Sequence, residues 1–117
     1  MNMRPLTNGE KSLIANFASR LGEEERQKLL ADMENATATL GTPDGSRVKF
    51  DIAGYERPPY RGQHSFGVEG RMLDSDGVEL SVVLHADENG RLLELELIRW
   101  DSADLLGPRW ETLRSQQ

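Results

Sequence analysis

The residues best placed to do chemistry lie on two neighbouring predicted strands late in the chain. His85 falls on one strand and Glu94 and Glu96 on the next, all at positions predicted to be polar. An imidazole beside two carboxylates can hold a metal ion or move a proton. The same residue types also suit an ordinary solvent-facing sheet surface, which is the simpler interpretation. This polar face is therefore one candidate site, with no catalytic role assigned.

A second candidate site is the proline-stiffened loop over residues 54–63 and the residue that follows it. Its proposed contact residues are Tyr55, Arg57, Tyr60, Arg61 and His64. Tyrosine and arginine supply much of the binding energy of protein interfaces, and loops carry function more often than scaffolds do. We therefore predict that this loop contacts a protein partner. The alternative is a crossover loop whose tyrosines cover the edge of the core.

Familiar enzyme motifs are absent from the sequence. The chain has no cysteine and two histidines, which leaves few of the usual nucleophile and base pairs. No phosphate-binding loop, dinucleotide-binding glycine pattern, nucleophile elbow or HExxH zinc pattern occurs. The segments 74–77 and 87–90 gather oxygen ligands beside a glycine, but they lack calcium-loop spacing and are typical of turns. The sequence therefore predicts no cofactor, no metal site and no catalytic residue, and it favours a non-enzyme.

Two helices are predicted at the start of the chain. Thr7 and Glu10 have the spacing of a capping box, and apolar residues recur at helical intervals over 13–21. Three consecutive glutamates at 23–25 favour the start of a second helix, because carboxylates interact well with a helix N-terminus. We expect a helical hairpin over residues 1–35.

Residues 36–100 predict an antiparallel, mostly meandering sheet of about five strands. A three-residue turn at 75–77 brings the apolar residues of two strands to one face. The pairs that this register predicts are Val68 with Leu84 and Met72 with Leu80. In the last strand, Leu93, Leu95 and Leu97 are predicted to face the core.

The remaining residues, 101–117, predict an irregular tail that packs back on the sheet. Trp100 and Trp110 could extend the contact surface of the loop, but tryptophan near the end of a sheet is usually buried, so both are expected in the core. At 117 residues the chain is long enough for one modest core. We therefore predict a single α+β domain over 1–117, with both helices on one face of the sheet.

Composition and charge narrow the choice of partners and compartment. The chain is 37% hydrophobic and carries a net charge of −6, which disfavours nucleic acid and favours a basic protein partner. No apolar run approaches the ~20 residues of a membrane span, and the polar start is not a secretory signal. We therefore expect a cytoplasmic protein without membrane contact. Self-association through an exposed sheet edge, giving a homo-oligomer, is a further alternative.

Two stretches of the chain resemble a family of small bacterial domains of unknown function. They are Arg4-Pro5-Leu6-Thr7 followed by Glu10, and Gly90-Arg91-Leu92 leading to Glu94-Leu95-Glu96. The resemblance implies a small bacterial α+β protein with no assigned catalytic residues. The hairpin also resembles, less closely, immunity proteins that neutralise toxins of competing bacteria. We therefore expect a non-enzymatic protein-binding module of immunity or inhibitor type. The alternative is a small-ligand or metal-dependent activity at the polar face of the last hairpin.

Overall fold

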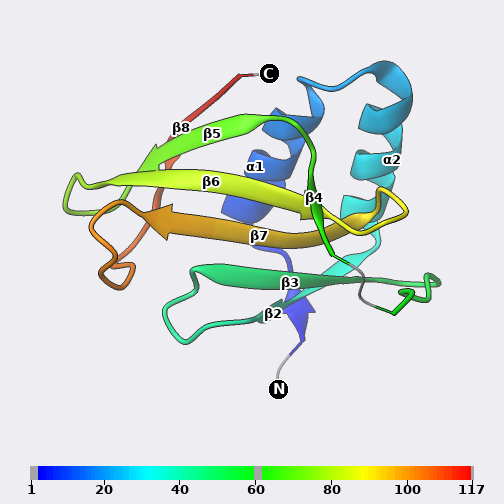
Figure 1. Cartoon of the computed structure of the whole chain (residues 1–117), viewed down its shortest axis with the longest axis horizontal. Coiled ribbons are helices and arrows are strands. Elements are labelled where there is room, and N and C mark those ends of the chain that lie inside the picture. Colours follow the sequence, from blue (N-terminus) through cyan, green and yellow to red (C-terminus); the bar gives the residue numbers. More distant parts are fainter. Residues whose placement is uncertain (1–2, 60–61, 117) are drawn as a thin grey trace.

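The computed structural model describes residues 3–59 and 62–116, in which it contains two helices and an eight-stranded antiparallel sheet (Figure 1). Both helices lie behind the sheet in this view, so the sheet has a covered face and an open face. The α+β class and the placement of both helices on one face are confirmed. The expected number of about five strands is too low.

The helices are α1 (Asn8–Ala18) and α2 (Glu23–Glu34). The strands are β1 (Arg4–Pro5), β2 (Ala36–Leu40), β3 (Arg47–Ile52), β4 (His64–Ser65), β5 (Glu69–Leu73), β6 (Glu79–Ala86), β7 (Leu92–Arg99) and β8 (Arg109–Gln116). Their order across the sheet is β1-β2-β3-β7-β6-β5-β8, and β4 pairs with β6. The strands β5, β6 and β7 form the predicted meander. The loop between β3 and β4 is a crossover that skips β7.

The start of α1 follows from its capping box. The Thr7 hydroxyl accepts a hydrogen bond from the Glu10 amide at 3.1 Å, and the Glu10 carboxylate accepts one from the Thr7 amide at 2.9 Å. Phe17, near the end of the same helix, is fully buried against the sheet. The sheet position beneath it is Gly70, where a Cβ would lie 2.7 Å from the Phe17 ring. Glycine at this position therefore allows the helix to approach the sheet.

The tail is not irregular, as the sequence had led us to expect. β8 pairs with β5, with Arg114 directly opposite Arg71, and Trp110 packs partly buried against the core. The pattern of β8 was missed because none of its residues is buried, and the alternation of exposed and half-buried residues breaks between Thr112 and Leu113. The strands β1 and β4 were missed because each is only two residues long.

The turn before β6 has the predicted geometry for its first pairs. Met72 pairs with Leu80, the Asp74 amide donates to the Val78 carbonyl at 2.9 Å, and Gly77 has the left-handed φ of 86°. The predicted register does not extend to Val68 and Leu84, because the Leu84 carbonyl accepts a hydrogen bond from the Phe66 amide at 3.2 Å. The register shifts between β4 and β5, so that His64 pairs with Ala86 whereas Gly70 pairs with Val82.

A second irregularity changes which leucines of β7 are buried. The register between β6 and β7 shifts beside Ala86, so that Leu92 faces the core together with Leu95 and Leu97. Leu93, which we expected there, is half-buried. This second shift matters for the open face, because it sets where the outward residues of β6 and β7 meet.

The core lies between the covered face of the sheet and the two helices. Its largest fully buried side chains include Phe17, Leu29, Phe50, Met72, Leu80, Leu84, Leu92 and Leu95. Neither of the helices in the described residues has the length and apolarity to cross a membrane. The open face, which no helix covers, carries the polar side chains considered next.

Candidate functional site

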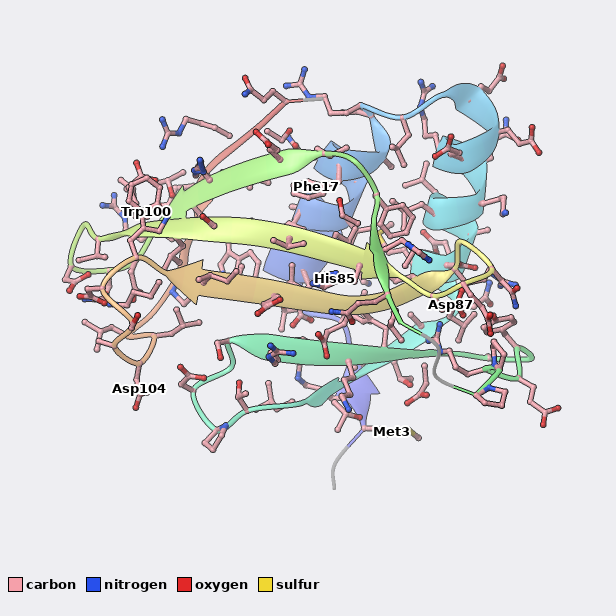
Figure 2. The ribbon with its side chains drawn as sticks, viewed as in Figure 1. Met3, Phe17, His85, Asp87, Trp100 and Asp104 are labelled. Atoms are coloured by element: carbon pink, nitrogen blue, oxygen red, sulfur yellow. The ribbon has the colours of Figure 1, made fainter. Side chains whose placement is uncertain are left out.

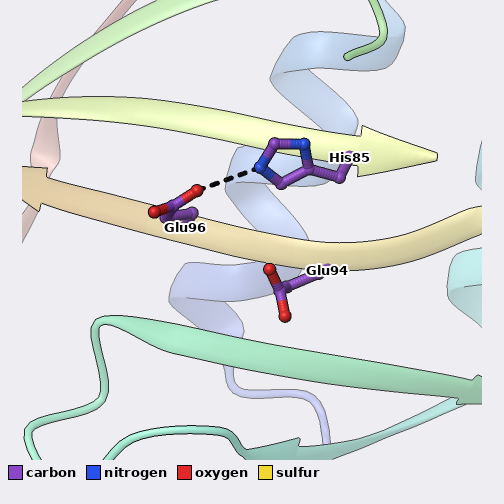
Figure 3. A group of neighbouring side chains, drawn as sticks. All are labelled: His85, Glu94 and Glu96. Carbon is purple, nitrogen blue, oxygen red and sulfur yellow. Dashed lines mark hydrogen bonds and ion pairs between the residues drawn. The ribbon is translucent and has the colours of Figure 1, made fainter. Parts of the chain in front are cut away.

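The three residues of the predicted polar face do come together on the open face of the sheet (Figure 3). His85 on β6 lies directly opposite Glu94 on β7, and Glu96 follows two residues later on the same side. The His85 Nε2 atom is 3.1 Å from a carboxylate oxygen of Glu96. One donor atom from each of the three residues lies within 4.8 Å of the others. This spacing is compatible with the binding of a single cation.

Arg47 on β3 already supplies positive charge to this cluster. Its guanidinium lies 3.4 Å from Glu94 and 3.1 Å from Glu96. Lys49 on the same strand is directly opposite Glu94. The two carboxylates are therefore balanced by cationic side chains, which is the arrangement expected of a cross-strand ion-pair network.

Glu94 differs from what the sequence led us to expect. We predicted a solvent-facing side chain, but the residue is only 5% exposed because the neighbouring strands carry long side chains around it. A buried carboxylate is stable only when it is paired or coordinated. The 3.4 Å contact with Arg47 is long for a charge-assisted hydrogen bond.

Two residues of the loop candidate hold the loop to the turn between β6 and β7. The Tyr55 hydroxyl donates to Asp87 at 2.6 Å, and the Arg57 guanidinium donates to the same carboxylate at 2.9 Å. Arg57 also donates to the Phe50 carbonyl at 2.7 Å, and the Arg91 guanidinium lies over the Tyr55 ring at 4.2 Å. These contacts anchor the crossover.

The hydrogen bond between Tyr55 and Asp87 changes the pKa of both side chains. Burial, and then the hydrogen bond to Asp87, raises the pKa of the Tyr55 phenol. Burial alone would raise the pKa of Asp87, but hydrogen bonds from Tyr55, the Arg91 amide and Arg57 lower it. Asp87 is therefore an ionised anchor for the crossover loop.

The other loop residues are placed differently. Tyr60 and Arg61 lie outside the described residues, so their predicted contacts stay predictions. His64 is exposed at the start of β4. It borders a hollow of about 300 Å³ together with Phe66, Glu25 and Glu88. Of the five loop residues proposed as contacts, Tyr55 and Arg57 are thus occupied within the molecule.

A third surface feature, which we call the tryptophan patch, consists of Arg71, Ser81, Ile98 and Trp100. We expected Trp100 in the core, but it lies on the open face and is 58% exposed. Its indole N–H donates to the Ser81 hydroxyl at 3.0 Å, and the Arg71 guanidinium lies over its ring at 5.1 Å. Ile98, directly opposite Ser81, is 44% exposed. Figure 2 labels Trp100 and Asp87 at opposite ends of the sheet.

The alternation of β7 contained a signal for this patch. Glu94 and Glu96 are outward residues, so Ile98 and Trp100 continue the same row. The prediction placed Trp100 in the core because tryptophan is usually buried, although its place in the alternation of β7 indicated the outward face. Residue type alone therefore gave the wrong face.

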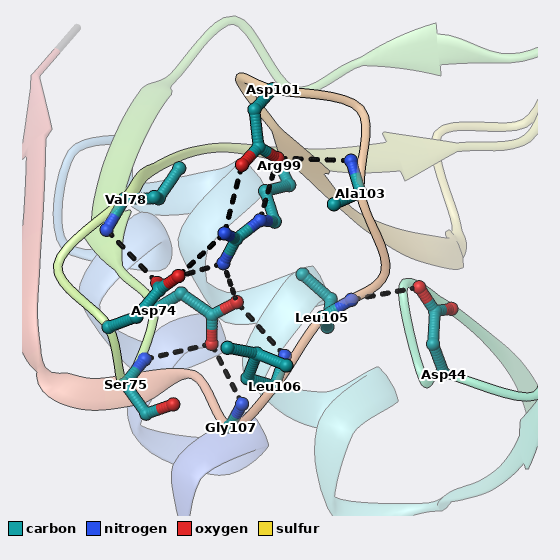
Figure 4. Close-up of polar contacts among 11 residues, drawn as sticks. Asp44, Asp74, Ser75, Val78, Arg99, Asp101, Ala103, Leu105, Leu106 and Gly107 are labelled. Carbon is teal, nitrogen blue, oxygen red and sulfur yellow. Dashed lines mark hydrogen bonds and ion pairs between the residues drawn. The ribbon is translucent and has the colours of Figure 1, made fainter.

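The segment after Trp100 is fixed by a charge cluster around the buried side chains of Arg99 and Asp74 (Figure 4). Arg99 donates to Asp74 at 2.7 Å, to Asp76 at 2.6 Å and to Asp101 at 2.7 Å. Asp74 also accepts hydrogen bonds from the amides of residues 106 and 107. These contacts position the end of β7, and with it Trp100, on the turn between β5 and β6.

Comparisons with known proteins give a family and no function. No curated protein and no solved structure matches this chain. One family model, described as Domain of unknown function (DUF6984), matches residues 3–108, which end just before β8. The resemblance inferred from the opening segment and the last hairpin to a family of unknown function is confirmed at that level. The chain belongs to the DUF6984 family.

Proposed function

We propose that this domain is a protein-binding module whose contact surface is the open face of the sheet, centred on the tryptophan patch. The observation that carries this proposal is the state of Trp100, which is largely exposed and yet held by Ser81 and Arg71. Ile98 adds a second exposed apolar side chain beside it. A fixed aromatic ring loses little side-chain entropy on binding, and tryptophan and arginine are enriched among residues that dominate interface energies.

Charge gives the expected class of partner. The net charge of −6 attracts a protein of positive net charge and speeds the encounter. An inhibitor of immunity type would use such a surface to cover the active region of a basic toxin. The loop residues Tyr55 and Arg57 have a smaller part in this proposal, because they hold the crossover loop to Asp87.

The test compares a patch variant with a matched exposed apolar control. The tagged chain is used to capture partners from a lysate of the organism that encodes it, and affinity for the captured protein is then measured. Trp100→Ala should weaken binding by about tenfold or more, because truncating a central interface residue often costs that much. Met3→Ala should leave binding unchanged, since Met3 is also exposed but lies away from the patch (Figure 2).

Both variants should unfold cooperatively in urea like the unmodified chain, because neither side chain belongs to the core. A partner that is retained at full affinity by both Trp100→Ala and Ile98→Asp would show that the patch is not the interface.

A second candidate function is cation or small-ligand binding at the cluster of His85, Glu94 and Glu96. The specific observation in its favour is the spacing of the three donor atoms, all within 4.8 Å. One imidazole nitrogen and two carboxylates form a donor set that zinc, manganese or iron accepts. Arg47 competes with such an ion, because its guanidinium now contacts both carboxylates.

This competition makes the second candidate testable. If a divalent ion binds, Arg47→Ala should raise its affinity and Glu94→Gln should abolish binding, as read by isothermal titration with Zn²⁺ or Mn²⁺. Lys11→Ala, on exposed α1 surface, serves as the control for general loss of positive charge. An absence of binding in both the unmodified chain and Arg47→Ala would refute this candidate.

A further inference from the structure

The tryptophan patch borders a hollow between β5, β6 and β8. Its volume is about 370 Å³, which is in the size range of small-ligand sites. We call it the arginine hollow and define it by Arg71, Glu79, Trp100 and Arg114. All four side chains line it. The hollow thus combines two guanidinium groups with an aromatic ring, which are groups that bind oxyanions and apolar side chains.

Arg71 is held by stacking and not by hydrogen bonds. Its guanidinium lies over the Trp100 ring at 5.1 Å, and among the described residues it makes no ion pair or hydrogen bond. The Trp100 ring is itself fixed through its hydrogen bond to Ser81. A stacked guanidinium keeps its N–H groups in the plane of the group, where they can donate to a planar oxyanion.

The second arginine of the hollow, Arg114, differs from Arg71 in having a partner. Arg114 lies directly opposite Arg71 on the neighbouring strand, and like charges in this relation repel. Arg114 has a partner, because its guanidinium lies 3.0 Å from Glu79. Arg71 has none within the described residues. Among the described residues the hollow therefore holds one guanidinium whose N–H donors are free, beside two carboxylates, those of Glu69 and Glu79.

We propose that the arginine hollow binds a single carboxylate supplied by the partner protein; this inference rests on the proposed function. The carboxylate accepts two N–H groups of Arg71, and the apolar residue beside it in the partner packs on Trp100. A carboxylate fits better than a doubly charged phosphate, because Glu79 and Glu69 also line the hollow and would repel the extra charge. The carboxylate comes from an aspartate or glutamate side chain or from the end of a chain.

The test uses short peptides and the indole N–H signals of the chain in ¹⁵N-labelled protein. The chain has two tryptophans, so Trp110, which packs beside Gly9 on α1, is an internal control. The first probe is a peptide with blocked ends that contains Glu-Phe. The others replace the glutamate by glutamine, by phosphoserine, or by glycine with a free C-terminal carboxylate. We expect a saturable shift of the Trp100 signal with the glutamate peptide or the free C-terminus, and a weaker effect or none with the other two.

Matched variants identify the residue responsible. Arg71→Gln should weaken binding of the glutamate peptide by about tenfold or more, because it removes the charge and the paired donors. Arg71→Lys should weaken it less, since it keeps the charge and loses the planar fork. Arg109→Gln is the control, as it removes an exposed arginine of the neighbouring strand β8 outside the hollow.

Two outcomes would overturn the inference: equal binding of the glutamate and glutamine peptides, or full binding by Arg71→Gln. Its failure can be told from that of the proposed function. If Trp100→Ala abolishes partner binding and Arg71→Gln does not, the patch is an interface without a carboxylate contact. If the peptide binds as expected but partner binding survives Trp100→Ala, the proposed function is wrong and the hollow is a ligand site.

Discussion

At the scale of single residues, Asp74 contributes more to stability than its position in a turn would suggest. Its side chain is fully buried, and its two oxygens accept four hydrogen bonds. The donors are the amides of Ser75, Leu106 and Gly107 and the guanidinium of Arg99. Asparagine in this place would direct an amino group toward groups that are themselves donors. We expect Asp74→Asn to lower the free energy of unfolding by about 3 kcal/mol, as measured by urea denaturation.

Asp76 offers the matched comparison, because it pairs with the same arginine. Its carboxylate lies 2.6 Å from Arg99, but its side chain is 38% exposed and water can replace the lost contact. Asp76→Asn should therefore destabilise the fold clearly less than Asp74→Asn. Equal losses would mean that the common partner Arg99, and not burial with the backbone amides, gives Asp74 its importance.

At the scale of elements, local sequence patterns correctly predicted the features that depend on residues close together in the chain. The capping box of Thr7 and Glu10 placed the start of α1. The turn at 75–77 was found from register alone. In each case the deciding interactions join residues close in the sequence, so the sequence pattern is sufficient to predict them.

The missed features depend on contacts between distant segments. Tyr55 and Arg57 anchor the crossover because Asp87, some thirty residues later, supplies the acceptor. Glu94 is buried because β3, which carries Arg47, is its neighbour in the sheet. Strand order decides both, and no spacing within a single segment encodes it. The cluster of His85, Glu94 and Glu96 was predictable because one hairpin contains all three.

At the scale of the whole molecule, the turns and the segment after β7 share one chemical device, an aspartate whose carboxylate is held by hydrogen bonds. The aspartates whose pKa is lowered in this way are Asp44, Asp74, Asp76, Asp87 and Asp101. Hydrogen bonds from Ser46, and then from the Leu105 amide, lower the pKa of Asp44 to about 2. Burial would raise the pKa of Asp74, but its backbone and Arg99 donors lower it to about 2. Both carboxylates also bind the segment that follows β7.

Acid should therefore destabilise the molecule through these connections. An unfolded aspartate has a pKa of about 3.9. Between that pH and about pH 2, the unfolded state binds more protons than the folded state, so stability falls as pH falls. The contribution of these carboxylates is fully present above the unfolded pKa and is lost as pH approaches the folded values. For Asp74 alone the loss is on the order of 2 kcal/mol.

Urea denaturation at several pH values between 7 and 2 measures this loss of stability, and Asp74→Asn should show a shallower decline over the same range. Parallel declines in the two proteins would assign the acid sensitivity to other carboxylates. A shallower decline would show that one buried aspartate links the pH response of the whole fold to the segment that positions Trp100.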